Sequence, residues 1–257
     1  MDPFQAGLAA IVGVCIGSFL NVCIYRLPRG QSLVTPPSRC PSCERPLRWY
    51  HNIPIVSWVV LRGRCAHCQA PISMQYPAIE LVTALVWVLI VWLTPAGWLL
   101  ASRLVLATAL IVLFMIDLEH QLLPNVITLP GIVVGLAFSF VAPPGPSDSL
   151  LGIFLGGGVL YAIAAAYYLL RKEEGMGMGD VKMLAMVGAF LGWRAVLLTL
   201  VFASFTGATI GMAMVALQRG SMRYALPFGT FLAVGALVAM LFGEQIIAWY
   251  LGFYPAS

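Results

Sequence analysis

Long apolar runs dominate this chain and restrict it to folds that can exist in lipid. Of its 257 residues, 61% are hydrophobic and only 9% are charged. A helix needs about 20 apolar residues to cross a bilayer, and only helices and closed barrels satisfy their backbone hydrogen bonds there. The runs are continuous rather than alternating, which favours helices over barrel strands. The sequence therefore predicts an all-α polytopic membrane protein.

We expect about eight transmembrane helices joined mostly by short loops. The first run lacks a preceding basic segment and an obvious cleavage site, so it is predicted to be a retained span rather than a removed signal peptide. The predicted spans cover residues 5–25, 77–94, 98–116, 125–141, 149–170, 181–192, 195–217 and the region from 227 onward.

Basic residues are concentrated in one loop, and they predict the orientation of the chain. Half of the 14 Lys and Arg residues lie between Arg26 and Arg64. Cytoplasmic loops carry such an excess of positive charge. Eight spans then place Arg171-Lys172, Arg219 and Arg223 on the same side, with the N-terminus in the periplasm. This pattern indicates a loop beside membrane lipid rather than a nucleic-acid-binding surface, so we expect no nucleic-acid partner.

Two aspartates lie where predicted spans meet the cytoplasmic side. Asp117 follows the third span, and Asp180 precedes the sixth, within the glycine-rich stretch 175–182. An acid at the centre of a membrane helix costs roughly 2.5–3.5 kcal/mol on insertion scales, so it is a functional candidate by default. Each also has a simpler explanation: Asp180 as a helix N-cap and Asp117 as an interfacial residue. Their common side favours a shared catalytic site.

Two carboxylates can hydrolyse a peptide bond if one accepts a proton from water and the other donates a proton to the carbonyl oxygen. Acids about 3 Å apart cannot both be ionised at neutral pH. A helix N-terminus favours a charge on Asp180, and a helix end disfavours one on Asp117. The pair titrates as a unit, so the position of its shared proton stays open. Glu119 and His120 are weaker candidates, and Lys182 is expected either to act beside Asp180 or to extend toward the interface.

Four cysteines form two CxxC pairs in the loop between the first two spans: Cys40, Cys43, Cys65 and Cys68. Their spacing is close to the four-cysteine zinc pattern. A closed tetrahedral site of this kind is structural rather than catalytic, and it would stabilise a loop too short for a large core. The alternative is a disulfide or redox pair, which fits poorly with a cytoplasmic face. Two other cysteines, Cys15 and Cys23, are expected to pack within the first span.

These features predict three parts along the chain. Residues 1–25 form the first transmembrane helix, residues 26–76 a small cytoplasmic domain with a zinc knuckle, and residues 77–257 a transmembrane protease core.

Several further motifs occur in the same order along the chain, and together they resemble the bacterial type IV prepilin peptidases. The glycine–aspartate motif is shared with presenilin-like proteases, but its combination with the two CxxC pairs is specific. The motifs are Gly17-Ser18-Phe19-Leu20-Asn21-Val22, Asn52-Ile53-Pro54, Gly63-Arg64-Cys65, Tyr76-Pro77-x-x-Glu80, Leu123-Pro124, Gly177-x-Gly179-Asp180-x-Lys182 and Pro227-Phe228-Gly229.

The resemblance implies an inner-membrane aspartic endopeptidase of the type IV pilus and type II secretion systems. Members of the family cleave the leader of prepilins and pseudopilins after a glycine, at the cytoplasmic face. Many then methylate the new N-terminal residue with S-adenosylmethionine, an activity associated with the cysteine loop. The family aspartates correspond to Asp117 and Asp180. We also expect small residues in the first, fifth and seventh spans to admit the apolar helix of the substrate.

The sequence does not identify the residues that bind the methyl donor, because no glycine-rich nucleotide motif follows a strand. Glu80, Asn52 and Arg64 are weak candidates, and a structural role is expected for each. One departure from the family pattern is Thr230, which stands where the family often has proline. We expect this departure to leave catalysis unaffected.

Three alternative functions remain open at this point. A transporter or channel would place its acids near the midplane and commonly carries inverted repeats, which this sequence does not display. A non-enzymatic assembly factor would use the cysteine loop for docking and would not need Asp117. An intramembrane protease of another kind would use the same aspartates on different substrates.

Overall fold

The computed structural model describes residues 3–172, 177–217 and 226–253, and in these ranges every extended regular element is a helix. The prediction of an all-α membrane protein is confirmed. Of the glycine-rich stretch, Gly175 and Met176 lie outside the described residues, as do Arg219 and Arg223. The chain forms two compact units, Met1–Pro95 and Ala96–Ser257. The functional division at residues 25 and 76 stays a prediction.

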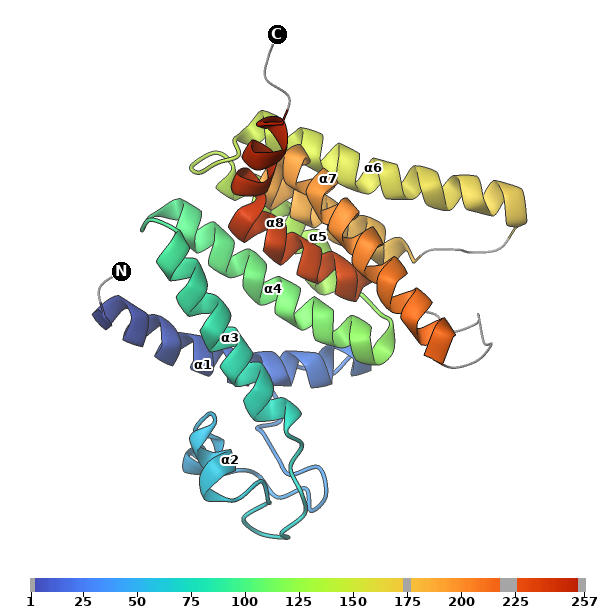
Figure 1. Ribbon diagram of the computed structural model, residues 1–257. Helices are drawn as coiled ribbons and strands as arrows, with labels where there is room; N and C mark the ends of the chain where they lie inside the picture. The colour runs from blue at the N-terminus through green and yellow to red at the C-terminus, as the bar shows by residue number, and fades with distance from the viewer. Residues whose placement is uncertain (1–2, 173–176, 218–225, 254–257) are drawn as a thin grey trace. The chain divides into compact units, whose positions relative to one another are not determined.

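The first unit consists of two packed helices and the loop between them. Helix α1 (Pro3–Arg26) packs along α3 (Gln75–Leu93), and the intervening loop contains the short helix α2 (Val56–Val60). A Cβ atom on Gly17 would lie only 2.6 Å from the Cα of Glu80, so a glycine is required for this close approach. The cysteine loop connects the C-terminal end of α1 to the N-terminal end of α3 (Figure 1).

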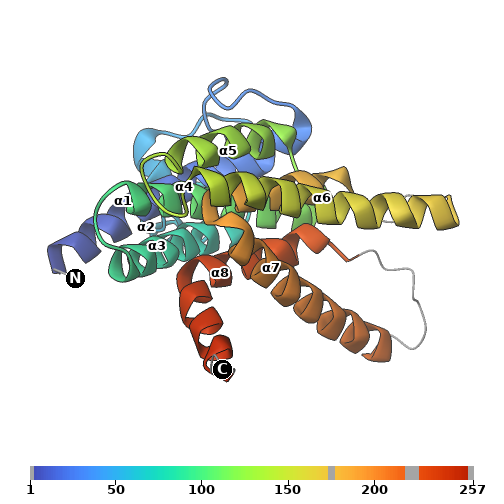
Figure 2. The same ribbon diagram turned by 90° about the horizontal axis from the view of Figure 1, so that it is seen from above.

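Within the described residues, the second unit consists of five helices, with α7 at their centre. These are α4 (Trp98–His120), α5 (Asn125–Phe138), α6 (Pro146–Arg171), α7 (Met178–Leu217) and α8 (Phe228–Leu251). Helix α7 packs against α5, α6 and α8, while α4 packs mainly against α8. The C-terminal part of α6 extends beyond its neighbours (Figures 1 and 2). The central position of α7 explains why the residues from Val181 to Phe190 are almost all buried.

Helix α7 is interrupted at Gly192, where φ is 78° and ψ is 176°. This left-handed backbone favours glycine. This break in the helix coincides with the predicted boundary between the sixth and seventh spans. Among the described residues, six helices are long and apolar enough to cross a membrane, and α5 is a shorter apolar helix. The count of eight spans stays a prediction, because it requires α5 and each part of α7 to cross separately.

Small residues expected to admit a substrate helix are largely used for packing within the chain. Gly152 of α6 lies directly against Gly188 of α7, and a Cβ on Gly156 would lie 2.6 Å from the carbonyl oxygen of Leu184. Together with the glycines of α1, these residues bring neighbouring helices of the protein close to one another. The expectation that small residues admit the substrate helix stays a prediction for the first and fifth predicted spans, where Gly7 and Gly158 have no neighbour within 4 Å of an added Cβ.

Candidate active site and metal centre

Asp117 lies in the last turn of α4 and is held by the first turn of α8. Its carboxylate is only 4% exposed. The backbone N–H of Thr230 donates to Oδ2 of Asp117 at 2.7 Å, and the Thr230 hydroxyl lies 3.3 Å from the same oxygen. That hydroxyl has one proton and lies nearer to the carbonyl oxygen of Pro227, at 2.5 Å. The backbone N–H is therefore the main donor to Asp117.

This contact gives Thr230 a place at the site, whereas the expectation that its departure from the family pattern leaves catalysis unaffected stays a prediction. A proline at this position would lack the N–H that donates to Asp117. The two residues are 113 positions apart in sequence. No local pattern indicated the contact, although the Pro227-Phe228-Gly229 motif pointed to this turn of α8.

Asp180 is the third residue of α7 and is 9% exposed. It directly follows Gly179, which packs against Leu123, and Leu123 also lies beside Gly229 and so next to Asp117. Within the described ranges no donor bonds to the Asp180 carboxylate; the backbone N–H of Asp180 itself donates to the carbonyl oxygen of Gly177 at 3.2 Å. The second unit thus brings the two predicted catalytic acids together, with one fixed by a hydrogen bond and the other open to a further partner.

Helix ends alone do not place the negative charge on Asp180 rather than on Asp117. Asp117 lies at the end of α4, but its carboxylate faces the N-terminus of α8, where N–H groups and the helix dipole stabilise an anion. Asp180 lies in the first turn of α7. Both acids therefore face a helix N-terminus, and helix position does not distinguish them.

Leu123 holds the three helix ends of this site together. It lies in the turn between α4 and α5 and is 8% exposed. A Cβ on Gly179 would lie 2.9 Å from the Cβ of Leu123, and a Cβ on Gly229 would lie 3.0 Å from its Cδ1. The Gly229 Cβ would also lie 2.9 Å from Oδ2 of Asp117. The two glycines therefore allow the ends of α7 and α8 to approach Leu123 and the acids.

Other charged candidates lie outside this pair. Glu119 and His120 are exposed and form an ion pair at 3.8 Å. The Nζ atom of Lys182 donates to Oδ1 of Asn125 at 2.9 Å, so this lysine connects the first turns of α7 and α5. The secondary rank predicted for Glu119 and His120 agrees with their exposure.

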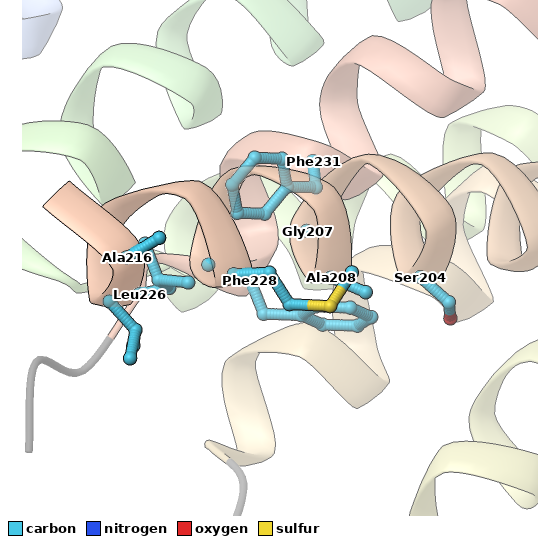
Figure 3. A pocket seen from close by; sticks show the side chains of 10 residues that line it. Ser204, Gly207, Ala208, Ala216, Leu226, Phe228 and Phe231 are labelled. Atoms are coloured by element: carbon cyan, nitrogen blue, oxygen red, sulfur yellow. The ribbon is translucent and has the colours of Figure 1, made fainter. Parts of the chain in front are cut away.

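An apolar groove of about 720 Å³ adjoins the same turn of α8. Phe228 and Phe231 line it from α8, and Gly207, Ala208 and Gly211 line it from the second part of α7. Figure 3 shows both phenylalanine rings beside the small residues of α7. Since the Asp117 partner Thr230 lies between the two phenylalanines in sequence, the first turn of α8 contributes to the acid pair and to the groove.

The four predicted metal ligands converge in the loop of the first unit. The sulfur atoms of Cys40, Cys43, Cys65 and Cys68 all lie within 4.8 Å of one another. Tetrahedral zinc with Zn–S bonds of about 2.3 Å requires sulfur separations of about 3.8 Å. The Cys40 and Cys68 sulfurs are 3.8 Å apart, and none of the cysteines forms a disulfide. The donor set and its dimensions fit a structural zinc ion.

The two CxxC knuckles have the same backbone structure. In the first, the N–H of Cys40 donates to the Arg45 carbonyl; in the second, the N–H of Cys65 donates to the Ala70 carbonyl. Backbone N–H groups of Cys68 and His67 lower the pKa of the Cys65 thiol to about 6, whereas burial and the neighbouring thiols raise the pKa of Cys68 to about 11. A depressed thiol pKa favours the thiolate, which is the form that binds a metal.

Comparison with known proteins agrees with this geometry. Residues 11–94 match the bacterial peptidase A24 N-terminal domain, and residues 104–212 match the type IV leader peptidase family. The chain belongs to the type IV leader peptidase family. The two matched regions fall within the two compact units. The candidate acids lie in the second region and the four cysteines in the first.

Several curated relatives match along nearly their whole length, and each carries the name prepilin leader peptidase/N-methyltransferase. The protein from Stutzerimonas stutzeri is 37% identical, with 98% of this chain and 96% of the relative covered. The one from Aeromonas hydrophila is 38% identical, with 95% and 93% covered. The one from Neisseria gonorrhoeae is 36% identical, with 98% and 96% covered. No solved structure matches the chain with significance. With its six long apolar helices, the chain is a multi-pass bacterial membrane protein.

Proposed function

We propose that this protein removes the leader peptide from prepilins or pseudopilins and then methylates the new N-terminal residue. Its family and the names of its relatives support both activities. The observation that carries the peptidase assignment is the convergence of two buried carboxylates, Asp117 and Asp180, at adjoining helix ends. The function of a transporter or an assembly factor does not require a pair of acids beside glycines at these helix ends.

The two acids suit water-mediated hydrolysis. One carboxylate accepts a proton from water as the water oxygen attacks the scissile carbonyl carbon, and the other carboxylic acid donates a proton to the carbonyl oxygen. When the C–N bond breaks, the departing amine takes up a proton from the pair. In this proposal the N–H of Thr230 fixes the orientation of Asp117, while the open Asp180 carboxylate contacts the water.

The apolar groove beside α8 suits the apolar segment that follows the leader in a prepilin. Small residues line the groove on α7 and phenylalanines line it on α8. The small residues allow another helix to approach α7 closely. The first turn of α8 supplies Phe228 and Phe231 to the groove and Thr230 to Asp117, which supports a substrate path from the groove to the acids. We therefore propose that the groove holds the substrate while its leader junction reaches the acid pair.

Methylation requires a donor, and S-adenosylmethionine supplies a methyl group on a positively charged sulfur. We propose that zinc bound by Cys40, Cys43, Cys65 and Cys68 stabilises the loop needed for this second activity. The loop is too small for a substantial apolar core, so it depends on such a cross-link.

The proposed location is the bacterial inner membrane, with the acids at the cytoplasmic face and the N-terminus in the periplasm. The support is the basic loop from Arg26 to Arg64 and the position of both acids at helix ends. Incubating the purified protein with a prepilin and S-adenosylmethionine tests the function. Loss of the leader mass followed by a gain of one methyl group is expected, whereas an unchanged substrate mass would contradict the proposal.

A further inference from the structure

A cavity of about 830 Å³ lies within the first unit, separate from the acids of the second unit in sequence and lining. Residues of α1, α3 and the cysteine loop line it, including Cys40 and Cys65 of the metal cluster. Sites for small molecules and cofactors are commonly cavities of about 300–1,000 Å³. The dimensions of this cavity therefore fit a nucleoside-sized ligand.

A buried carboxylate faces this cavity without a cationic partner. Glu80 of α3 is 7% exposed. Its Oε2 atom accepts the N–H of Ile55 at 2.7 Å, and the Ser18 hydroxyl donates to the same carboxylate. In the described ranges no Lys, Arg or His forms an ion pair with Glu80. A carboxylate offers about four acceptor positions, so it can bind a cation in addition to these two donors.

The loop segment around Ile55, which bonds to Glu80, has a strained backbone conformation. Ile55 has φ of 59° and ψ of −52°, in a region that β-branched residues rarely occupy. Such strain costs about 1–3 kcal/mol and persists only where the surroundings impose it. The hydrogen bond from Ile55 to Glu80 connects this strained turn to α3. The carboxylate is thus built into the wall of the cavity rather than placed at a free surface.

A buried guanidinium lies at the same cavity. Arg26 of α1 is 9% exposed and donates to the carbonyl oxygens of Ser32 at 2.8 Å and Pro36 at 2.7 Å. No carboxylate among the described residues forms an ion pair with it. Buried charges are normally paired, because an uncompensated charge is costly to remove from water. The cavity therefore contains one negatively and one positively charged side chain. Each forms hydrogen bonds with neutral groups, and neither has an oppositely charged partner among the described residues.

The indole of Trp58 adds a flat apolar surface. Trp58 lines the cavity, and its Nε1–H donates to the carbonyl oxygen of Ile72 at 3.2 Å, which fixes the ring. Aromatic faces of this kind stack against nucleobases. An acid, a guanidinium and a fixed aromatic ring in one cavity match a ligand with a cationic centre, a carboxylate and a purine.

We propose that this cavity binds S-adenosylmethionine, with Glu80 contacting its cationic part, Arg26 its carboxylate and Trp58 its adenine. This inference rests on the methyl transfer proposed above and assigns it a site. The Glu80 role also differs from the structural role expected from the sequence. Since Cys40 and Cys65 form part of the wall, the metal cluster supports the cavity without contacting the reacting atoms.

Equilibrium dialysis of the purified full-length protein against tritiated S-adenosylmethionine, without prepilin, tests the proposal. The Glu80→Gln variant keeps the acceptor for Ile55 but lacks the negative charge, and we expect its affinity to fall at least tenfold. Its rate of leader cleavage is expected to stay near wild type, which also reports on folding. Asp148→Asn is the matched control, because it removes a carboxylate on α6 that does not line the cavity. We expect this variant to bind S-adenosylmethionine with wild-type affinity.

Photo-crosslinking of the tritiated donor to the wild-type protein gives a second test that needs no variant. Labelled peptides are expected to contain cavity-lining residues between Ser18 and Glu80. Wild-type affinity in Glu80→Gln, or label confined to the second unit, would overturn the inference while leaving methyl transfer intact. Failure of the wild-type protein to methylate a cleaved pilin would instead contradict the proposed function.

Discussion

Replacing Gly179 with alanine tests how the acid pair is positioned. The new Cβ would lie 2.9 Å from the Cβ of Leu123, 3.3 Å from its Cδ1 and 3.4 Å from its Cγ. Favourable carbon contacts are about 3.5–4.0 Å, so the first turn of α7 has to move away from Leu123 by several tenths of an ångström or more. Overpacking of this kind costs about 1–3 kcal/mol, and a 1 Å displacement near reacting groups can lower a rate by about 100-fold.

We expect Gly179→Ala to lower kcat/KM for leader cleavage by about 10- to 100-fold. Gly177→Ala is the matched control in the same motif, because its nearest neighbour would be Oδ2 of Asp180 at an ordinary 3.8 Å. It is expected to retain most of the activity. Initial rates of leader loss from a purified prepilin, measured for both variants, give the comparison.

Combining Gly179→Ala with Leu123→Ala shows whether contact with Leu123 causes the loss of leader cleavage. Leu123→Ala removes the Cδ1 and Cγ contacts but keeps the Cβ contact, so it is expected to rescue Gly179→Ala in part. Coupling between contacting residues is typically about 0.5–3 kcal/mol. Equal loss of activity in Gly177→Ala and Gly179→Ala, or strictly additive effects with Leu123→Ala, would refute the packing argument.

Three further predictions concern the other parts of the protein. Gly229→Ala places a Cβ 2.9 Å from Oδ2 of Asp117 and should lower kcat at least tenfold in the cleavage assay, whereas unchanged kcat would contradict this contact. Ala208→Leu fills the apolar groove and should raise KM for prepilin with little change in kcat; Thr209→Leu, on the adjacent residue that does not line the groove, should leave KM unchanged. Elemental analysis should find zinc bound to the purified protein, and Cys40→Ser should lower zinc content and donor binding more than leader cleavage.

The sequence predicted residues whose roles follow from local patterns. The CxxC spacing identified four cysteines whose sulfurs converge, because ligand spacing is a local property. The position of Asp117 and Asp180 at span ends pointed to both acids for the same reason, and their catalytic role stays a prediction. The break at Gly192 was predictable for the same reason.

The contacts that the sequence did not reveal join distant segments. Thr230 donates to Asp117 across 113 positions, and Leu123 packs beside glycines of both α7 and α8. In the sequence Arg26 is one of the basic residues that predict the orientation of the chain, yet its guanidinium is buried and donates to carbonyls of the following loop. Tertiary packing determines each of these roles, so residue type and spacing alone could not predict them.

The central claim is that Asp117 and Asp180 act as one catalytic unit on the scissile amide. Intact-mass analysis of a prepilin incubated with Asp117→Asn, Asp180→Asn and the double variant tests it most directly. We expect each single variant to lose leader cleavage as completely as the double variant, because residues that act together have non-additive effects. Substantial leader removal by either single variant would contradict the account.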